Sequence, residues 1–162
     1  MTTKFACSLS LDVKITTSVV LTILLGLIVY SFLSYSKLIQ LSFIAVALGL
    51  FFFGLHNYFR SIEISDKEII IAGPFRAIKI PLSRDSIIQP TANGFKGAIR
   101  LFGSGGLFGY TGLYWSKSVG RFSSYVTNRS HSILIDSDSK KIMISPDDVS
   151  GFMEAVTQRI IH

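Results

Sequence analysis

The segment from residue 103 to residue 112 reads Gly-Ser-Gly-Gly-Leu-Phe-Gly-Tyr-Thr-Gly and is the most unusual stretch of the chain. Glycine adopts positive φ angles at little cost, so such a segment can turn several backbone N–H groups toward one anion. The segment lacks the Gly-Lys-Ser/Thr ending of a phosphate-binding P-loop, and its glycine spacing differs from that of the dinucleotide-binding motif. We therefore predict that the protein binds no nucleotide and uses no cofactor.

Aromatic and basic residues are interleaved with these glycines. Rings suit the lipid interface or the groove of a partner, and flanking basic side chains suit anionic lipid headgroups. Two other interpretations remain open: the glycines shape a long hairpin whose rings complete the core, or the segment lines a small-ligand pocket. The candidate partner or lipid contacts are Arg100, Phe108, Tyr110, Tyr114, Trp115, Lys117 and Arg121.

The remaining reactive side chains do not predict a catalytic or metal centre. His131 and Ser132 are neighbours at the start of a predicted strand, and a catalytic triad requires convergence in space that the sequence does not indicate. The aspartate pairs 136/138 and 147/148 are explained by a hairpin turn and by a helix start. Cys7 is the only cysteine, which excludes an intramolecular disulfide and a cysteine-based metal cluster. We predict that the protein is not an enzyme and holds no metal.

Two uncharged apolar runs, residues 15–36 and 38–59, are separated by the single charge of Lys37. A helix of about 22 residues is about 33 Å long, which is enough to cross a hydrocarbon core about 30 Å thick. A cleavable signal peptide does not fit the first run, which is longer than a typical signal core and is followed at once by a second run. We predict a transmembrane helical hairpin over residues 15–59, preceded by an N-terminal tail over residues 1–14.

The basic residues that flank the two runs predict the orientation of the hairpin. Lys4 and Lys14 precede the first run and four basic residues follow the second between positions 60 and 79, whereas the turn offers only Lys37. The positive-inside rule then places both ends of the chain and the following domain on the cytoplasmic side of the membrane. The net charge of +6 contains no dense basic stripe, so we predict an anionic lipid surface rather than a nucleic acid as its partner.

Residues 60–162 have the composition of a globular domain. Alternating and β-branched segments predict strands over 61–65, 68–72, 75–80, 86–89, 121–127, 132–136 and 140–145, interrupted by a Gly/aromatic insertion over 94–120. Ser145 and Pro146 favour a helix start, and apolar residues recur at helical spacing behind them, which predicts an amphipathic helix over 146–161. About seven antiparallel strands closed by a C-terminal helix are typical of a pleckstrin-homology-like (PH-like) barrel.

Three stretches carry a resemblance to a known family. They are IRLFGSGGLFGYTGLY at 99–114, GRFSSYVTN at 120–128 and KKIMISPDD at 140–148. Over about residues 61–162 the chain resembles the bacterial PH-domain family, in which two N-terminal spans are a common arrangement. The resemblance implies a PH-like barrel and a membrane-associated binding or scaffolding module, and it brings no established catalytic residues. The turn at 65–68 has mixed charge and does not reproduce the basic pattern of phosphoinositide-binding PH domains.

These observations predict a membrane-anchored, non-catalytic binding or scaffolding module at the cytoplasmic membrane face. Its predicted partners are the lipid bilayer and either another protein or a second copy of the chain. An alternative function is a structural homo-oligomer assembled through the hairpin and the PH-like barrel. A third interpretation is a hydrolase or transferase, which requires a pocket where His131 meets an acid and a nucleophile.

Overall fold

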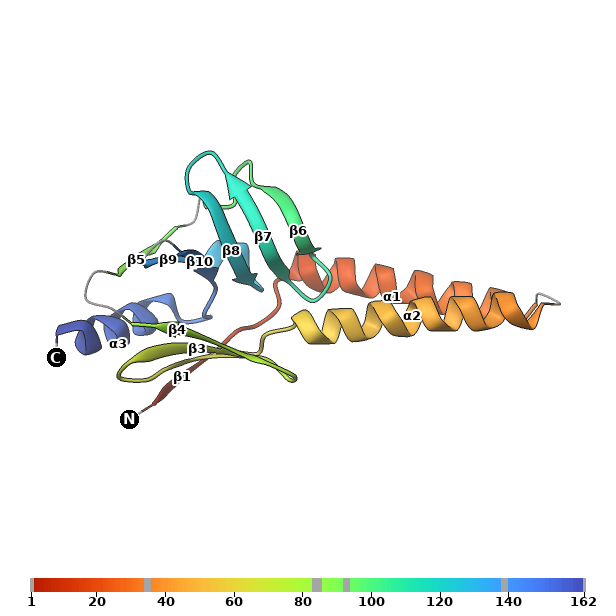
Figure 1. Ribbon diagram of the computed structural model, residues 1–162, viewed down its shortest axis with the longest axis horizontal. Helices are drawn as coiled ribbons and strands as arrows, with labels where there is room; N and C mark the ends of the chain where they lie inside the picture. Colours follow the sequence, from red (N-terminus) through yellow and green to blue (C-terminus); the bar gives the residue numbers. More distant parts are fainter. Residues whose placement is uncertain (1, 34–35, 83–85, 92–93, 138–139, 162) are drawn as a thin grey trace.

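Figure 1 shows the computed structural model, in which two long helices project side by side from one end of a β-rich domain. The structure describes residues 2–33, 36–82, 86–91, 94–137 and 140–161. The two helices are α1 (Leu11–Ser31) and α2 (Lys37–Asn57), and both are long and apolar enough to cross a membrane. In their most apolar stretches only 11 % and 6 % of the residues are buried inside the molecule. The rest of the molecule therefore leaves most of the residues in these two helices unburied.

The first sheet joins the two ends of this helical hairpin. Its four antiparallel strands follow the order β1 (Thr3–Ala6), β2 (Ser61–Ile64), β3 (Glu68–Ala72) and β4 (Ala77–Pro81). The residues that precede α1 therefore pair directly with the residues that follow α2, with Ala6 opposite Ser61 and Thr3 opposite Ile64. The predicted tail over residues 1–14 contains this edge strand, which is too short for its alternation to be recognised in the sequence.

The second sheet has six strands in the order β5, β9, β10, β8, β7, β6. All neighbours are antiparallel except β10 and β8, which run parallel. Strands β6 and β7 form a hairpin within the Gly/aromatic insertion, and β6 is the outermost strand. The bounds are β5 (Ile87–Pro90), β6 (Ile99–Gly105), β7 (Tyr110–Ser116), β8 (Gly120–Val126), β9 (Ile133–Ser137) and β10 (Lys140–Ile144). A short 3₁₀ helix, η1 (Arg129–His131), links β8 to β9.

Two apolar clusters hold the domain together. The larger one lies between the sheets and the C-terminal helix α3 (Val149–Ile161), where Phe152 and Val156 pack against isoleucines from β2, β3, β9 and β10. The smaller one lies on the other face of the second sheet, where Phe95 packs against Tyr114 and Phe122. Each cluster takes alternate residues from the same strands, as expected for a sheet that is covered on both faces.

Asp148 caps α3, because its side chain accepts a hydrogen bond from the Gly151 N–H at 2.9 Å. Ser145, the predicted cap, instead accepts the N–H groups of Thr127 and Asn128 and so ties β10 to the end of β8. The carboxylate of Asp147 accepts hydrogen bonds from Ser8 just before α1. The helix therefore starts at Val149, three residues beyond the predicted start.

The predicted order of two helices, a β-rich domain and a C-terminal helix is confirmed. The predicted closed barrel of about seven strands differs from the structure, in which the described residues form ten strands in two separate sheets. The three additional strands are β1, β6 and β7. The last two form the long hairpin that was one open interpretation of the Gly/aromatic insertion, although their glycines interrupt the apolar alternation that marks a strand.

Candidate functional site

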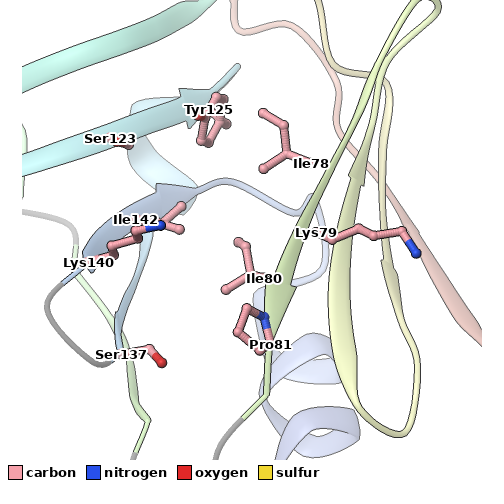
Figure 2. A pocket seen from close by; sticks show the side chains of 9 residues that line it. All are labelled: Ile78, Lys79, Ile80, Pro81, Ser123, Tyr125, Ser137, Lys140 and Ile142. Atoms are coloured by element: carbon pink, nitrogen blue, oxygen red, sulfur yellow. The ribbon is translucent and has the colours of Figure 1, made fainter.

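A cleft of about 400 Å³ lies between the two sheets, at the edge of β4. Figure 2 shows Ile78, Ile80 and Pro81 pointing from β4 into this cleft, toward Tyr125 and Ile142 on the second sheet. Because β4 is the last strand of its sheet, the cleft runs along a strand edge that has no neighbour among the described residues. The lining residues are Ile78, Lys79, Ile80, Pro81, Ser123, Tyr125, Ser137, Lys140 and Ile142.

The cleft is lined by four apolar residues together with two serines, one tyrosine and two lysines. Its nine lining residues include no histidine, cysteine or carboxylate. Lys79 points away from the cleft in Figure 2, and its ammonium group pairs with Glu68 at 2.9 Å. The exposed side chain of Lys140 supplies positive charge at the opposite rim. An apolar floor with an edge strand on one side suits an extended chain with apolar side chains.

A second constellation lies where the tip of the β6–β7 hairpin meets the helices. The hydroxyl of Thr17 on α1 donates to the carbonyl of Gly106 at 3.4 Å and accepts the N–H of Phe108 at 3.0 Å. Thr17 is buried, so both hydrogen bonds are shielded from solvent. The φ angle of Phe108 is +57°, a conformation rare for an aromatic residue, and it turns the ring toward α2.

The ring of Phe108 occupies the space that a side chain at Gly54 would fill. A Cβ atom placed on Gly54 would overlap with this ring, so the close approach of the hairpin to α2 depends on glycine at that position. Tyr58 lies beside the same ring, with the two centroids 6.4 Å apart. The hairpin tip is therefore packed against both helices.

A polar cluster completes this contact at the start of α1. The hydroxyl of Tyr110 donates to Asp12 Oδ2 at 2.6 Å, and Arg129 Nη2 lies 3.1 Å from the same oxygen. The Arg129 guanidinium also stacks over the Tyr110 ring, 4.5 Å from its centroid. Burial, and then the hydrogen bond to Asp12, raises the pKa of Tyr110 to about 12.

We use the name anchor joint for this contact between the hairpin tip and the helices. Through this joint, tertiary contacts connect the helical hairpin to the domain in addition to the covalent connection of the backbone. Its members are Asp12, Thr17, Gly54, Gly106, Phe108, Tyr110 and Arg129.

The structure divides the seven predicted contact residues into two groups. Phe108 and Tyr110 belong to the anchor joint, and Tyr114 is buried, with its hydroxyl donating to the carbonyl of Ser104. These three side chains are used within the molecule. The other four are exposed on β6, β7, β8 and the turn between β7 and β8; they are Arg100, Trp115, Lys117 and Arg121.

None of the described residues that were considered for catalysis or metal binding lines the cleft. Ser132 donates its hydroxyl to the carbonyl of Arg129 at 2.8 Å, and the buried Nδ1 atom of His131 has no hydrogen-bond partner within the described ranges. Asp136 pairs with Lys141 at 3.5 Å, whereas Asp138 lies outside the described residues. No group of three metal-ligating side chains was found in the part of the chain that the structure describes.

Sequence reasoning missed Asp12, Thr17 and Gly54 of the anchor joint and the isoleucines of the cleft. A buried threonine inside an apolar run is a detectable signal, because its hydroxyl needs a partner. The isoleucines give no such signal, because core strands carry the same residues.

Substitution of Gly54 by leucine is expected to detach the hairpin tip from α2, because the Phe108 ring loses its space. Hydrogen exchange in residues 105–109 should then accelerate by at least about tenfold, while exchange in β10 stays unchanged. Gly49→Leu is the matched control, because nothing lies within 4 Å of a Cβ atom at that position of the same helix. Equal protection of the tip in both variants would show that the joint does not depend on this packing.

Comparison with known proteins assigns the domain. The sequence model of a family described as bacterial PH domain matches residues 60–160, which is more than half of the chain. Neither the comparison with curated proteins nor that with solved structures gave a match. The matched range begins just after α2 and contains both sheets except β1, together with nearly all of α3. The chain therefore belongs to the bacterial PH domain family.

Proposed function

We propose that this protein is a membrane-anchored, non-catalytic binding module that holds its PH domain at the cytoplasmic face of the bacterial inner membrane. The anchoring is supported by two apolar helices of 21 residues each, in which few residues are buried inside the molecule. It is also supported by the pairing of β1 with β2 and by the anchor joint, because both keep the domain close to the base of the helices. The orientation follows from the basic residues that flank the helices.

The binding site in this proposal is the cleft between the sheets, and its partner is an extended segment of another protein. The position of the cleft along the edge of β4 is the observation that carries the proposal. An added strand would satisfy the outward-facing N–H and C=O groups of β4, and its alternate side chains would enter the space between Ile80 and Ile142.

Anchoring makes a small site of this kind useful. A volume of about 400 Å³ accommodates a few side chains, which predicts weak affinity for a free peptide. A partner that is itself held in the same membrane meets the cleft at a high effective concentration, so weak contacts suffice.

Peptide binding to the full-length protein in detergent tests the cleft. Short peptides selected from a random library against the protein should bind at least about tenfold more weakly to Ser123→Trp, whose ring fills the cleft. Ser130→Trp is the matched control, because Ser130 is exposed on η1 outside the cleft. Circular dichroism verifies that both variants are folded. Equal affinity for the two variants would place peptide binding elsewhere on the domain and contradict the proposal.

A further inference from the structure

The exposed apolar side chains of the domain are concentrated at one place. Outside α1, α2 and their connection, six large apolar side chains are exposed in the described structure, and four of these lie on β6 and β7. The exposed fractions are 59 % for Ile99, 53 % for Leu101, 76 % for Phe102 and 43 % for Trp115. A contiguous apolar group of this kind on a protein surface indicates an interaction site.

These four residues are neighbours in the sheet. Ile99 on β6 lies directly opposite Trp115 on β7, and Leu101 and Phe102 follow at the bulge in β6. Because β6 is the outermost strand of the sheet, no described strand covers this group on that side. We use the name hairpin patch for Ile99, Leu101, Phe102 and Trp115 together with the basic residues Arg100, Lys117 and Arg121.

The sequence around the hairpin patch is uniformly basic. No aspartate or glutamate occurs between residues 86 and 135, whereas the same interval contains five lysines and arginines. Arg129 is paired with Asp12, but Arg100, Lys117 and Arg121 are exposed, and Arg121 is the partner of Trp115 across β7 and β8. Apolar side chains surrounded by exposed positive charge match an anionic bilayer surface, which attracts basic residues that lie close to it.

The anchor joint determines where this patch lies relative to the membrane. Each helix has 21 residues, which at about 1.5 Å per residue matches a hydrocarbon core about 30 Å thick. The domain ends of α1 and α2 must therefore lie near the hydrocarbon boundary, and the tip of the β6–β7 hairpin contacts them at Thr17 and Gly54. In Figure 1, β6 is the strand of the second sheet closest to the helices. Tryptophan and basic residues are favoured at this depth.

We propose that the hairpin patch lies in the headgroup region of the bilayer that holds the helices and binds anionic phospholipid there. The inference rests on the proposed membrane anchoring. The bulge between Arg100 and Phe102 argues against the other use of an edge strand, pairing with β6 of a second copy, because bulges disrupt edge-to-edge pairing. The patch thus fixes the tilt of the domain and leaves the cleft along β4 on the other sheet available.

Trp115 is the only tryptophan of the chain, so its fluorescence reports directly on the patch. The full-length protein is reconstituted into phosphatidylcholine vesicles with and without phosphatidylglycerol. With phosphatidylglycerol present, lipids spin-labelled near the headgroup should reduce the Trp115 emission by at least about twofold. This quenching should be stronger than the quenching by lipids that are spin-labelled deep in the acyl chain. Aqueous iodide should quench at least about threefold less than in protein held in a zwitterionic detergent.

The charge dependence is tested with paired variants. Arg100→Gln with Arg121→Gln should remove most of the phosphatidylglycerol-dependent quenching, whereas Lys4→Gln with Lys67→Gln removes equal charge elsewhere and should leave it unchanged. Flotation of the vesicles after an alkaline wash separates the two proposals. Protein that does not float contradicts the anchoring and the inference with it.

If the protein floats but iodide quenches Trp115 and the spin-labelled lipids do not, the result overturns the inference about the hairpin patch and leaves the proposed anchoring in place. Shielding of Trp115 from iodide without lipid quenching, together with a dimer mass in native mass spectrometry, would assign the patch to a second copy and also overturn it.

Discussion

Substitution of Gly112 by alanine is expected to lower the free energy of unfolding by about 3–5 kcal/mol. Gly112 on β7 has a φ angle of +121°, and a Cβ atom there would overlap with the carbonyl oxygen of Phe102 on β6. The carbonyl belongs to the facing strand and cannot move without breaking the pairing of the hairpin. The backbone strain of alanine at this positive φ angle and the steric clash of its Cβ atom with the Phe102 carbonyl therefore both destabilise the variant. Chemical unfolding of the full-length protein in detergent, followed by Trp115 fluorescence, measures the loss.

Gly120→Ala is the matched control for this prediction. Gly120 at the start of β8 has a φ angle of +80°, but nothing lies within 4 Å of a Cβ atom there. The control therefore carries only the backbone strain, about 1–2 kcal/mol. Similar losses for the two variants would mean that close pairing of β6 with β7 contributes little to the stability of the domain.

The second large effect concerns labelling of cysteines in cells. Native Cys7 is 6 % exposed, and burial, together with the nearby Asp147 charge, raises the pKa of its thiol to about 12. A thiol whose pKa rises from 9.0 to about 12 has about 10³-fold less thiolate at pH 8, so maleimide should label native Cys7 about 10³-fold more slowly than an exposed cysteine. Because native Cys7 reacts so slowly, cysteines introduced elsewhere in the native chain can be labelled to map its topology.

In that background, Lys37→Cys at the exposed start of α2 should react with an impermeant maleimide in intact spheroplasts. Lys67→Cys, which is exposed between β2 and β3, should react only after lysis. The reverse pattern would place the PH domain on the outer side and contradict the proposed orientation. Rapid labelling of Cys7 in the folded native chain would show that β1 is not held against β2.

The two predictions concern the two places at which the domain is tied to the helices. Cys7 directly follows β1, and its N–H donates to the carbonyl of Arg60 at 3.0 Å, which ties the entry of α1 to the exit of α2. The β6–β7 hairpin reaches the helices from the other sheet. Because the helices are held at both places, the orientation of the domain relative to the helical hairpin follows from the folding of the domain itself.

Much of the fold is encoded locally and could be predicted from the sequence. The runs at 15–36 and 38–59 correspond to α1 and α2, and the seven predicted strands correspond to β2, β3, β4, β5, β8, β9 and β10. In each case the period of apolar residues identifies the element, because burial of one face is a local requirement. Membership of the bacterial PH domain family was also predicted from motifs and is confirmed.

The candidate sites depended on contacts between distant residues, which the local pattern does not contain. Phe108 and Tyr110 were candidates for contact with a lipid or a partner, and within the chain they contact Thr17 and Asp12, more than ninety positions earlier. The open cleft exists because β4 ends one sheet opposite β8 and β10 of the other, instead of pairing with them in a closed barrel.

The sequence alone determined which segments are apolar on every face, which alternate, and to which family the domain belongs. The tertiary structure alone decided which aromatic rings pack within the anchor joint, which apolar side chains stay exposed in the hairpin patch, and where the cleft lies. The physical reason is that residue type sets the preference of a side chain for burial, whereas the partner that buries it is chosen by the packing of the whole chain.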